Sequence, residues 1–154
     1  MLAGHVSQSL GGIEMSLDRM SLVRIVVLVF GAVYVLVGLM GFLGDPFVTG
    51  SDHGNMPSAE GDLLGIFPIN ALHNVVHLVI GAALLYGATA HDRAVLVARI
   101  VGGVYLVVGL LGFVAPDTFG LMPIGGPDIA LHLATAAILL GVTFIDRPAD
   151  ARRA

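Results

Sequence analysis

Four apolar runs, each near the length of a membrane-crossing helix, constrain what this chain can fold into. A helix needs about 20 residues to cross a hydrocarbon core of roughly 30 Å. The runs extend over 22–43, 70–89, 95–114 and 128–145. Of the 154 residues, 56% are hydrophobic and only 12% are charged, which argues against an ordinary soluble domain. The sequence predicts an all-α integral membrane protein, a four-helix bundle over 22–145 between tails at 1–21 and 146–154.

All positively charged residues are arginines, and they mark one end of the predicted bundle. They are Arg19, Arg24, Arg93, Arg99, Arg147, Arg152 and Arg153. The connections at the other end, 44–67 and 115–127, contain no arginine and carry Asp45, Asp52, Glu60, Asp62 and Asp117. Because cytoplasmic segments are enriched in positive charge, both termini are predicted to be cytoplasmic and the acidic loops to face outward.

The same charge pattern bears on location and partners. The arginines flank predicted membrane helices and do not interleave with aromatic residues, so the sequence indicates no nucleic-acid partner. We expect a multi-pass protein of the cell's inner (plasma) membrane, in contact with the lipid bilayer. A bundle this small could also assemble as a homo-oligomer or within a larger membrane complex.

The first and third predicted helices carry similar sequences. GAVYVLVGLMGF at 31–42 and GGVYLVVGLLGF at 102–113 agree at eight of twelve positions. GIFPI at 65–69 then matches GLMPI at 120–124, which aligns the second predicted helix with the fourth. The sequence therefore predicts two tandem two-helix repeats that enter the membrane in the same direction, about an axis along the membrane normal.

A polar stripe interrupts the second run, in the stretch PINALHNVVHLVIG. Its members are Asn70, His73, Asn74 and His77. Their spacing of i, i+3, i+4 and i+7 places them on one helix face. The repeat aligns His77 with His132 and His73 with Asp128, so the two pairs are predicted to approach each other. Ionisable side chains inside a membrane are costly, which makes a functional site the default hypothesis.

The first interpretation of this stripe is a transition-metal site. Imidazoles at i and i+4 can converge on one ion, and a carboxylate with a third imidazole would complete a tetrahedral set. The predicted ligands are His73, His77, Asp128 and His132. Asn70 and Asn74 would act as outer groups that orient the rings. The pattern leaves the metal open among zinc, iron, manganese and copper.

Two tyrosines at mid-depth in their helices are predicted to contact the same site. Tyr34 and Tyr105 occupy equivalent repeat positions between glycines spaced by seven residues. The glycines are Gly31, Gly38, Gly102 and Gly109, and small residues of this kind let helix backbones approach closely. Each buried tyrosine hydroxyl needs a partner, for which we expect a backbone carbonyl in preference to a histidine.

Three alternatives to the metal site stay open. His77 and His132 could ligate a haem iron between two helices, or the histidines could relay protons with Asp128. The third alternative is structural, with interhelical hydrogen bonds that only fix the packing. In that case Asp128 and Asn70 would cap their helices, and His73 and Asp128 would lie near outer helix ends that water reaches. No catalytic motif such as a GxSxG elbow or a phosphate loop is present.

The remaining histidines are weaker candidates. His5 lies in the first tail and His91 in the link between the second and third runs, where no group of chemical partners is evident. His53 lies in SDHGNMPSAEGD, whose glycines, serines, proline and acids predict a flexible, solvated outer loop.

The segment GIFPINALHNVVHLVIG, with its NxxHNxxHxxxG pattern, resembles a family of small bacterial four-helix membrane proteins classed as a domain of unknown function, DUF4383. The preceding YVLVGLMGFL is similar to the first helix of that family. The resemblance implies a four-helix membrane fold and no assigned activity, substrate or cofactor. We therefore expect an accessory or sensing module with a histidine-lined site near the outer face, or a structural or assembly subunit without a ligand.

Overall fold

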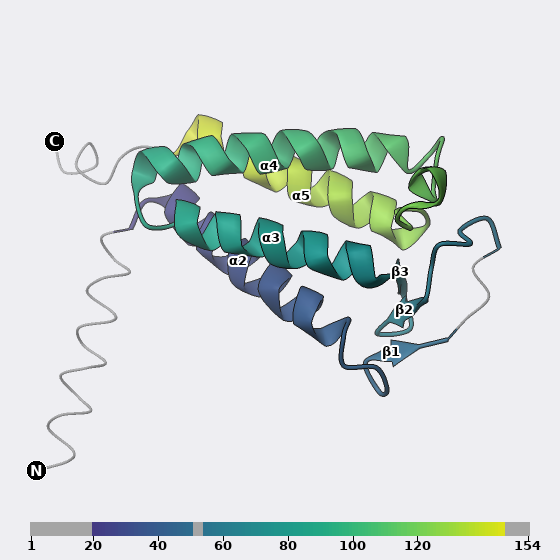
Figure 1. The fold of residues 1–154 in the computed structure, drawn as a ribbon. Coiled ribbons are helices and arrows are strands. Elements are labelled where there is room, and N and C mark those ends of the chain that lie inside the picture. The colour runs from purple at the N-terminus through teal and green to yellow at the C-terminus, as the bar shows by residue number, and fades with distance from the viewer. Residues whose placement is uncertain (1–19, 51–53, 147–154) are drawn as a thin grey trace, which may run out of the picture.

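The computed structural model describes residues 20–50 and 54–146, which form four helices side by side with a small sheet at one end (Figure 1). The helices are α2 (Leu22–Met40), α3 (Ala71–Gly87), α4 (His91–Leu111) and α5 (Pro127–Ile145). The prediction of a helical membrane bundle is confirmed at this level. Residues 1–19 and 147–154, which make up most of the predicted tails, lie outside the described residues, and so do the loop residues Asp52 and His53.

The third helix begins earlier than the sequence predicts. We expected a start at 95, but α4 begins at His91 and takes in Asp92 and Arg93, which we had assigned to a link. Asp92 lies in the first turn, where a negative charge complements the positive end of the helix dipole. The polar residues that suggested a connection therefore form the start of the helix.

Three of the described helices, α2, α4 and α5, are long and apolar enough to cross a membrane. The fourth, α3, has 17 residues, which is the short end of the spanning range. The outer surface of the bundle is apolar, because side chains such as Val79 and Val107 are 63% and 64% exposed. A soluble protein would not leave so many large apolar side chains in water, so this surface fits lipid.

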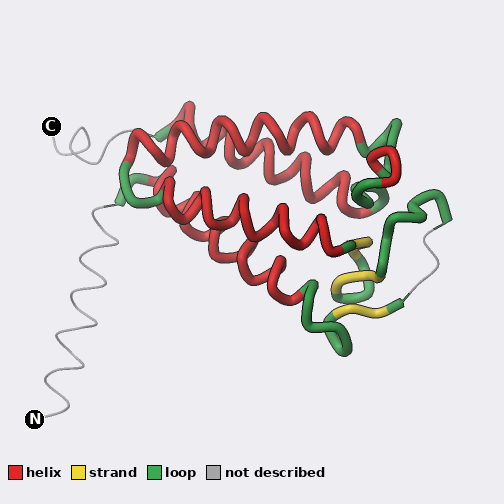
Figure 2. The backbone as a smooth tube through the Cα atoms, in the orientation of Figure 1, coloured by secondary structure: helices red, strands yellow, loops and turns green. Residues whose placement is uncertain are grey.

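The helices pack as two hairpins, α2 with α3 and α4 with α5 (Figure 2). In the first hairpin the backbones nearly touch. A Cβ atom on Gly81 would lie 2.7 Å from the backbone nitrogen of Val35, and one on Gly31 would lie 2.9 Å from that of Leu85. Only glycine permits this separation, and the close approach brings the polar face of α3 into the bundle interior.

The connection between α2 and α3 contains a sheet that the sequence did not predict. Its strands are β1 (Val48–Thr49), β2 (Gly61–Leu63) and β3 (Phe67–Ile69), paired antiparallel in that order. The sheet buries Leu63 and Ile69, which gives the segment an apolar core of its own. The described part of the loop that we expected to be flexible is thus folded over the end of the bundle, here named the loop end.

The two connections at the loop end are joined to each other. Ser58, in the first, donates from its backbone nitrogen and its hydroxyl to the carboxylate of Asp117, in the second. Gly125 packs so closely on Pro116 and on the buried Met56 that a Cβ there would lie 2.8 Å from the Met56 sulfur. The joined loops form a cover over the first turns of α3 and α5.

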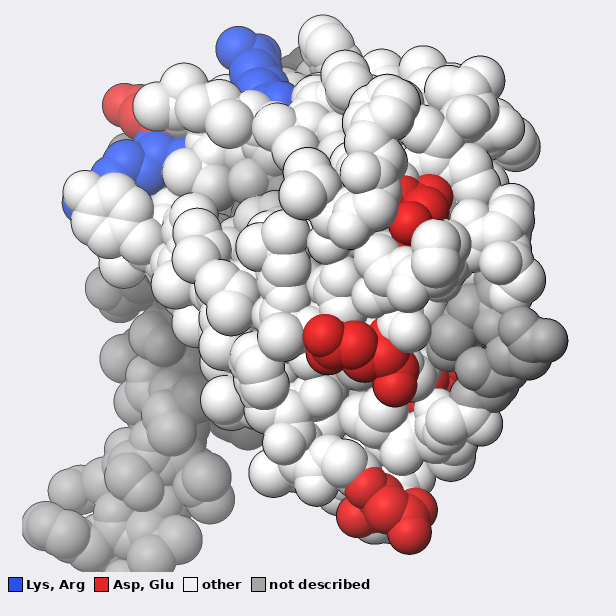
Figure 3. Space-filling model, turned by 45° about the vertical axis from the view of Figure 1, so that its right-hand side comes forward, with Lys and Arg blue, Asp and Glu red and all other residues white. Residues whose placement is uncertain are grey.

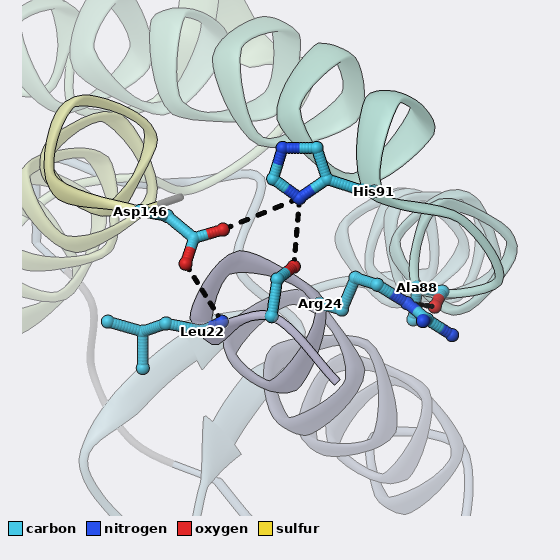
Figure 4. A network of polar contacts seen from close by, with 6 residues as sticks. Leu22, Arg24, Ala88, His91 and Asp146 are labelled. Atoms are coloured by element: carbon cyan, nitrogen blue, oxygen red, sulfur yellow. Dashed lines mark hydrogen bonds and ion pairs between the residues drawn. The ribbon is translucent and has the colours of Figure 1, made fainter. Parts of the chain in front are cut away.

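At the opposite end, here named the arginine end, a polar network ties the start of α2 to the other three helices (Figure 4). The Asp146 carboxylate accepts from the backbone nitrogen of Leu22 and lies 3.5 Å from His91 Nδ1. His91 Nδ1 also pairs with the Ser21 hydroxyl at 3.0 Å, and Arg24 donates to the carbonyl of Ala88. The expectation that His91 has no chemical partners is therefore wrong, because folding brings in residues from both ends of the chain.

Candidate functional site

Three buried histidines converge beneath the loop end. His73 and His77 come from α3, one turn apart, and His132 comes from α5. One ring nitrogen from each lies within 4.8 Å of those of the other two. Their exposed fractions are 1%, 4% and 3%. The repeat alignment and the helical spacing together predicted that these side chains approach each other, and the structure brings them together.

The rings of these histidines are closely packed. The His73 and His77 rings meet edge to face with 4.5 Å between centroids, and His73 stacks on His132 at 6.2 Å. A small cavity of about 40 Å³ lies beside them, between α3 and α4. Its lining is His73, Val76, His77, Ile80, Val104, Tyr105, Val108, Met122 and His132. The histidines therefore line one side of a space large enough for a water-sized group.

Asp128 lies against His73 and is 1% exposed. Its Oδ2 is 3.6 Å from His73 Nε2. Two expectations about this residue are corrected. The α5 N-cap is Gly126, and Asp128 lies in the first turn instead, because the helix already begins at Pro127. Asp128 and His73 are also not at a wet helix end, because the joined loops cover them.

Several polar atoms of this cluster have no hydrogen-bond partner among the described residues. They are both ring nitrogens of His73, Nδ1 of His77, Nδ1 of His132 and Oδ2 of Asp128. The carbonyls of Pro68 and Pro123 approach His73 without reaching hydrogen-bond geometry. Buried polar groups in proteins almost always have partners, and an unpaired one costs about 1–3 kcal/mol. Such a concentration of unpaired polar atoms at one point favours a bound ion or ordered water molecules there.

Both predicted tyrosines border this cluster. Tyr34 meets the His77 ring edge to face at 5.2 Å, and Tyr105 lies 4.9 Å from the His132 ring. The Tyr34 hydroxyl pairs with the Thr135 hydroxyl at 3.0 Å, so the expected carbonyl partner is wrong for Tyr34. Helix carbonyls at this depth are already bonded within their own helices, whereas a threonine hydroxyl on the facing helix can still pair.

The two asparagines have different roles. Asn70 is the N-cap of α3 and accepts from the backbone nitrogen of His73 at 2.9 Å. Its amide also donates to the carbonyls of Ser58 and Leu121. With both ends of its side chain engaged, Asn70 holds α3 and the two loops together and sets the position of His73. It is a positioning group and is not free to bind a ligand directly.

Asn74 turns away from the histidines toward α2. A Cβ atom on Gly41 would lie only 2.1 Å from Asn74 Oδ1, so the side chain occupies the space that this glycine leaves. Asn74 lines a separate hollow at the loop end together with Glu60 and Ile69. We predicted that Asn74 orients the histidine rings, but its side chain points toward Gly41, at the end of α2.

Sequence reasoning missed two residues of the site. Thr135, one turn after His132, supplies the partner of Tyr34. Met122 lines the cavity with the three histidines. A signal for Met122 was present in the repeat, where GLMPI carries methionine at the position that GIFPI fills with Phe67. It went unused because loop residues cannot be placed against a helix from spacing alone.

Comparison with known proteins gives one match. Residues 24–145 match the family model described as Domain of unknown function (DUF4383). No curated protein and no solved structure matches the chain. The matched segment runs from the first turn of α2 to the end of α5, and therefore includes every residue of the histidine cluster. The chain therefore belongs to the DUF4383 family, a family of unknown function.

Proposed function

We propose that His73, His77 and His132 bind one transition-metal ion. The observation that carries this proposal is the convergence of three buried imidazoles whose nitrogens lie within 4.8 Å of one another. Two nitrogens on one ion lie no more than about 4.2 Å apart, twice a bond length of about 2.1 Å. Small rotations of the rings would close that difference. Neutral imidazole is the commonest metal ligand and suits zinc, copper and iron.

Asp128 supports this site from outside the ligand set. Its carboxylate faces Nε2 of His73, so it can accept a hydrogen bond from the N–H of that nitrogen while Nδ1 turns to the metal. Carboxylates commonly hold metal-binding histidines in this way, which fixes the tautomer and raises the basicity of the ligand. We assign Asp128 to this orienting role in preference to the direct ligation that spacing suggested.

The size of the cavity favours a bare ion over haem. A volume of about 40 Å³ accommodates a water-sized group, whereas a porphyrin is many times larger. The rings of Tyr34 and Tyr105 lie 5.4 Å apart and fill the space between His77 and His132 that a macrocycle would need. Proton relay is less well supported, because no chain of polar groups leads from the cluster to the arginine end among the described residues.

The orientation that we propose places the site in the outer half of the bilayer. The described acids Asp45, Glu60, Asp62 and Asp117 lie at the loop end, and Arg24 and Arg93 lie at the other end. Figure 3 shows acidic side chains spread over the surface near the loops, and basic side chains at the opposite edge with acidic atoms beside them. This distribution supports cytoplasmic termini by the positive-inside rule. As a test, a reporter enzyme that works only in the cytoplasm should be active when it is fused after Ala154.

We propose further that the chain consists of two parallel repeats and that all four helices span the membrane. Two equivalent contacts support this. Tyr34 packs on His77 within the first hairpin as Tyr105 packs on His132 within the second, at 5.2 and 4.9 Å. A pseudo-twofold axis along the bundle would generate both contacts, and would also set His73 opposite Asp128.

The role that fits this site is an accessory or sensing module of the membrane. A metal held by buried side chains, without a catalytic motif in the sequence, is better suited to reporting or delivering the ion than to turnover. A structural subunit is the competing function. It is favoured by the Tyr34–Thr135 pair and by the three bonds of Asn70, which would hold the hairpins together without a ligand.

Elemental analysis of the protein purified in detergent separates these functions. The wild-type chain should carry one transition-metal ion, and His77→Ala and His132→Ala should lose it. His91→Ala is the matched control, because it removes a histidine of the arginine end that is remote from the cluster. Circular dichroism would verify that each variant keeps its helices. Metal-free wild-type protein whose stability is insensitive to chelators would contradict the proposal and favour the structural role.

A further inference from the structure

The cavity beside the histidines has one lining residue that can donate a soft ligand, Met122. This methionine lies in the loop between the short 3₁₀ turn η1 (Thr118–Gly120) and α5. It is half-buried and borders the same cavity as His73, His77 and His132. The cavity lining is otherwise aliphatic apart from Tyr105. A thioether at this place is therefore the only further neutral metal donor that the lining offers.

The loop holds Met122 in place through its neighbours. The carbonyl of Leu121 accepts a hydrogen bond from the side-chain amide of Asn70 at 2.9 Å. The backbone nitrogen of Ile124 donates to the carbonyl of Pro116 at 2.7 Å. Asn70 also caps the helix that carries His73. The same side chain thus fixes both the first histidine and the residue preceding Met122, so the methionine and the histidines form one positioned set.

We infer that this site binds monovalent copper, with the Met122 thioether as the ligand that joins the three histidines. This inference rests on the proposed metal site and names its ion. Thioether sulfur is a soft, polarisable donor that selects Cu(I), whereas manganese prefers carboxylate and water oxygens. Three imidazoles alone would suit zinc equally well, so the discrimination comes from the sulfur.

Charge gives a second and independent argument. Within the cluster Asp128 is the only described acid, and the three imidazoles, the thioether and both tyrosines bring no negative charge as neutral groups. A net charge in a low-dielectric interior is expensive. Cu(I) adds one unit of positive charge to this buried cluster, whereas a divalent ion adds two. The monovalent ion is therefore the less costly occupant.

Competition titrations test the inference on full-length protein in detergent. Cu(I), kept reduced with ascorbate in the absence of oxygen, would be titrated against a coloured Cu(I) chelator, and Zn(II) against a zinc indicator. Wild-type protein should bind Cu(I) more tightly than Zn(II). Met122→Leu keeps the apolar volume of the side chain. It should weaken the affinity for Cu(I) by about tenfold or more and leave the affinity for Zn(II) unchanged. Met56→Leu is the control, since Met56 is buried in the other loop and does not line the cavity.

X-ray absorption of the copper-loaded protein gives a direct readout of the ligand. The wild type should show nitrogen scattering with a copper–sulfur path, and selenomethionine labelling should replace that path with copper–selenium. Met122→Leu should remove it, and Met56→Leu should keep it.

Copper binding without a sulfur path, or unchanged affinity in Met122→Leu, would overturn the role of Met122. Tighter binding of Zn(II) than of Cu(I) would overturn the assignment of the ion while the histidine site stands. Failure of every metal to bind would instead remove the proposed function itself.

Discussion

Tyr34 of α2 and Thr135 of α5 share a buried hydrogen bond, with 3.0 Å between their hydroxyl oxygens. Each residue belongs to a different hairpin, and neither has contact with solvent that could replace the bond. The ring of the same tyrosine contacts the His77 ring, with 5.2 Å between the ring centroids. The bond therefore locks the two hairpins together directly beside the histidine cluster.

Removal of the Tyr34 hydroxyl should weaken the bundle modestly. Tyr34→Phe keeps the ring against His77 but leaves the Thr135 hydroxyl unpaired, at a cost of about 0.5–1.5 kcal/mol in the free energy of unfolding. Thr135→Val should cost a similar amount. In a double-mutant cycle, measured by unfolding in mixed micelles, the two changes should be less than additive. Strict additivity would show that the hydroxyls do not interact.

Loss of the Asp128 carboxyl group should reduce metal affinity without abolishing binding. Asp128→Asn removes the carboxylate that faces His73 Nε2 but retains the shape of the side chain. Loss of such an orienting group typically weakens metal binding about 10–100-fold. The measurement is a competition titration with a chelator. Asp92→Asn, at the arginine end of α4, should leave affinity unchanged, and an equal effect of both variants would contradict the assignment.

Asn70 should contribute to stability through two separable interactions. Asn70→Ser retains a side-chain oxygen that can cap α3, but loses the amide that donates to Ser58 and Leu121. Asn70→Ala loses all three bonds. We expect a cost of about 1–3 kcal/mol for Ala and a smaller cost for Ser. Hydrogen exchange should show faster opening of both loops in each variant, and protection equal to the wild type would contradict this role.

The close approach of α2 and α3 predicts that Gly81 tolerates no side chain. A Cβ atom in Gly81→Ala would lie 2.7 Å from the backbone of Val35, so the helices would have to separate. We expect a cost of about 1–3 kcal/mol from this overpacking. Gly103→Ala in α4 is the control, because a Cβ there meets no atom within 4 Å. Thermal unfolding in detergent should show a lower midpoint temperature for Gly81→Ala and an unchanged one for Gly103→Ala.

The network at the arginine end should stabilise the start of α2. Asp146→Ala removes the acceptor of the Leu22 backbone nitrogen and the partner of His91 (Figure 4). We expect a loss of about 1 kcal/mol, typical of a helix N-terminal acceptor. Hydrogen exchange of the first turn of α2 should accelerate, while protection beside His77 should persist. Uniform loss of protection would indicate global unfolding instead.

Much of the fold follows from pattern alone. Apolar runs of helix-crossing length can satisfy their backbone polar groups in lipid only as helices, which is why the helical membrane bundle is predictable. The end of α2 at Met40 and the start of α4 at His91 differ from the predicted 43 and 95, because capping and dipole effects act over single turns. The sheet at 48–69 was not predicted, since its strands are only two or three residues long.

The sequence by itself determined that this chain forms apolar helices and that its polar side chains lie on the inner face of one of them, because helical periodicity and the cost of polarity in lipid are local properties. The internal repeat also predicted that His73 and His77 approach Asp128 and His132. Only the tertiary structure decided that Asn74 turns to Gly41 and that Met122 reaches the histidine cavity. These contacts depend on how closely the glycines let the helices approach and on how the loops fold over them, and spacing along a chain carries neither quantity.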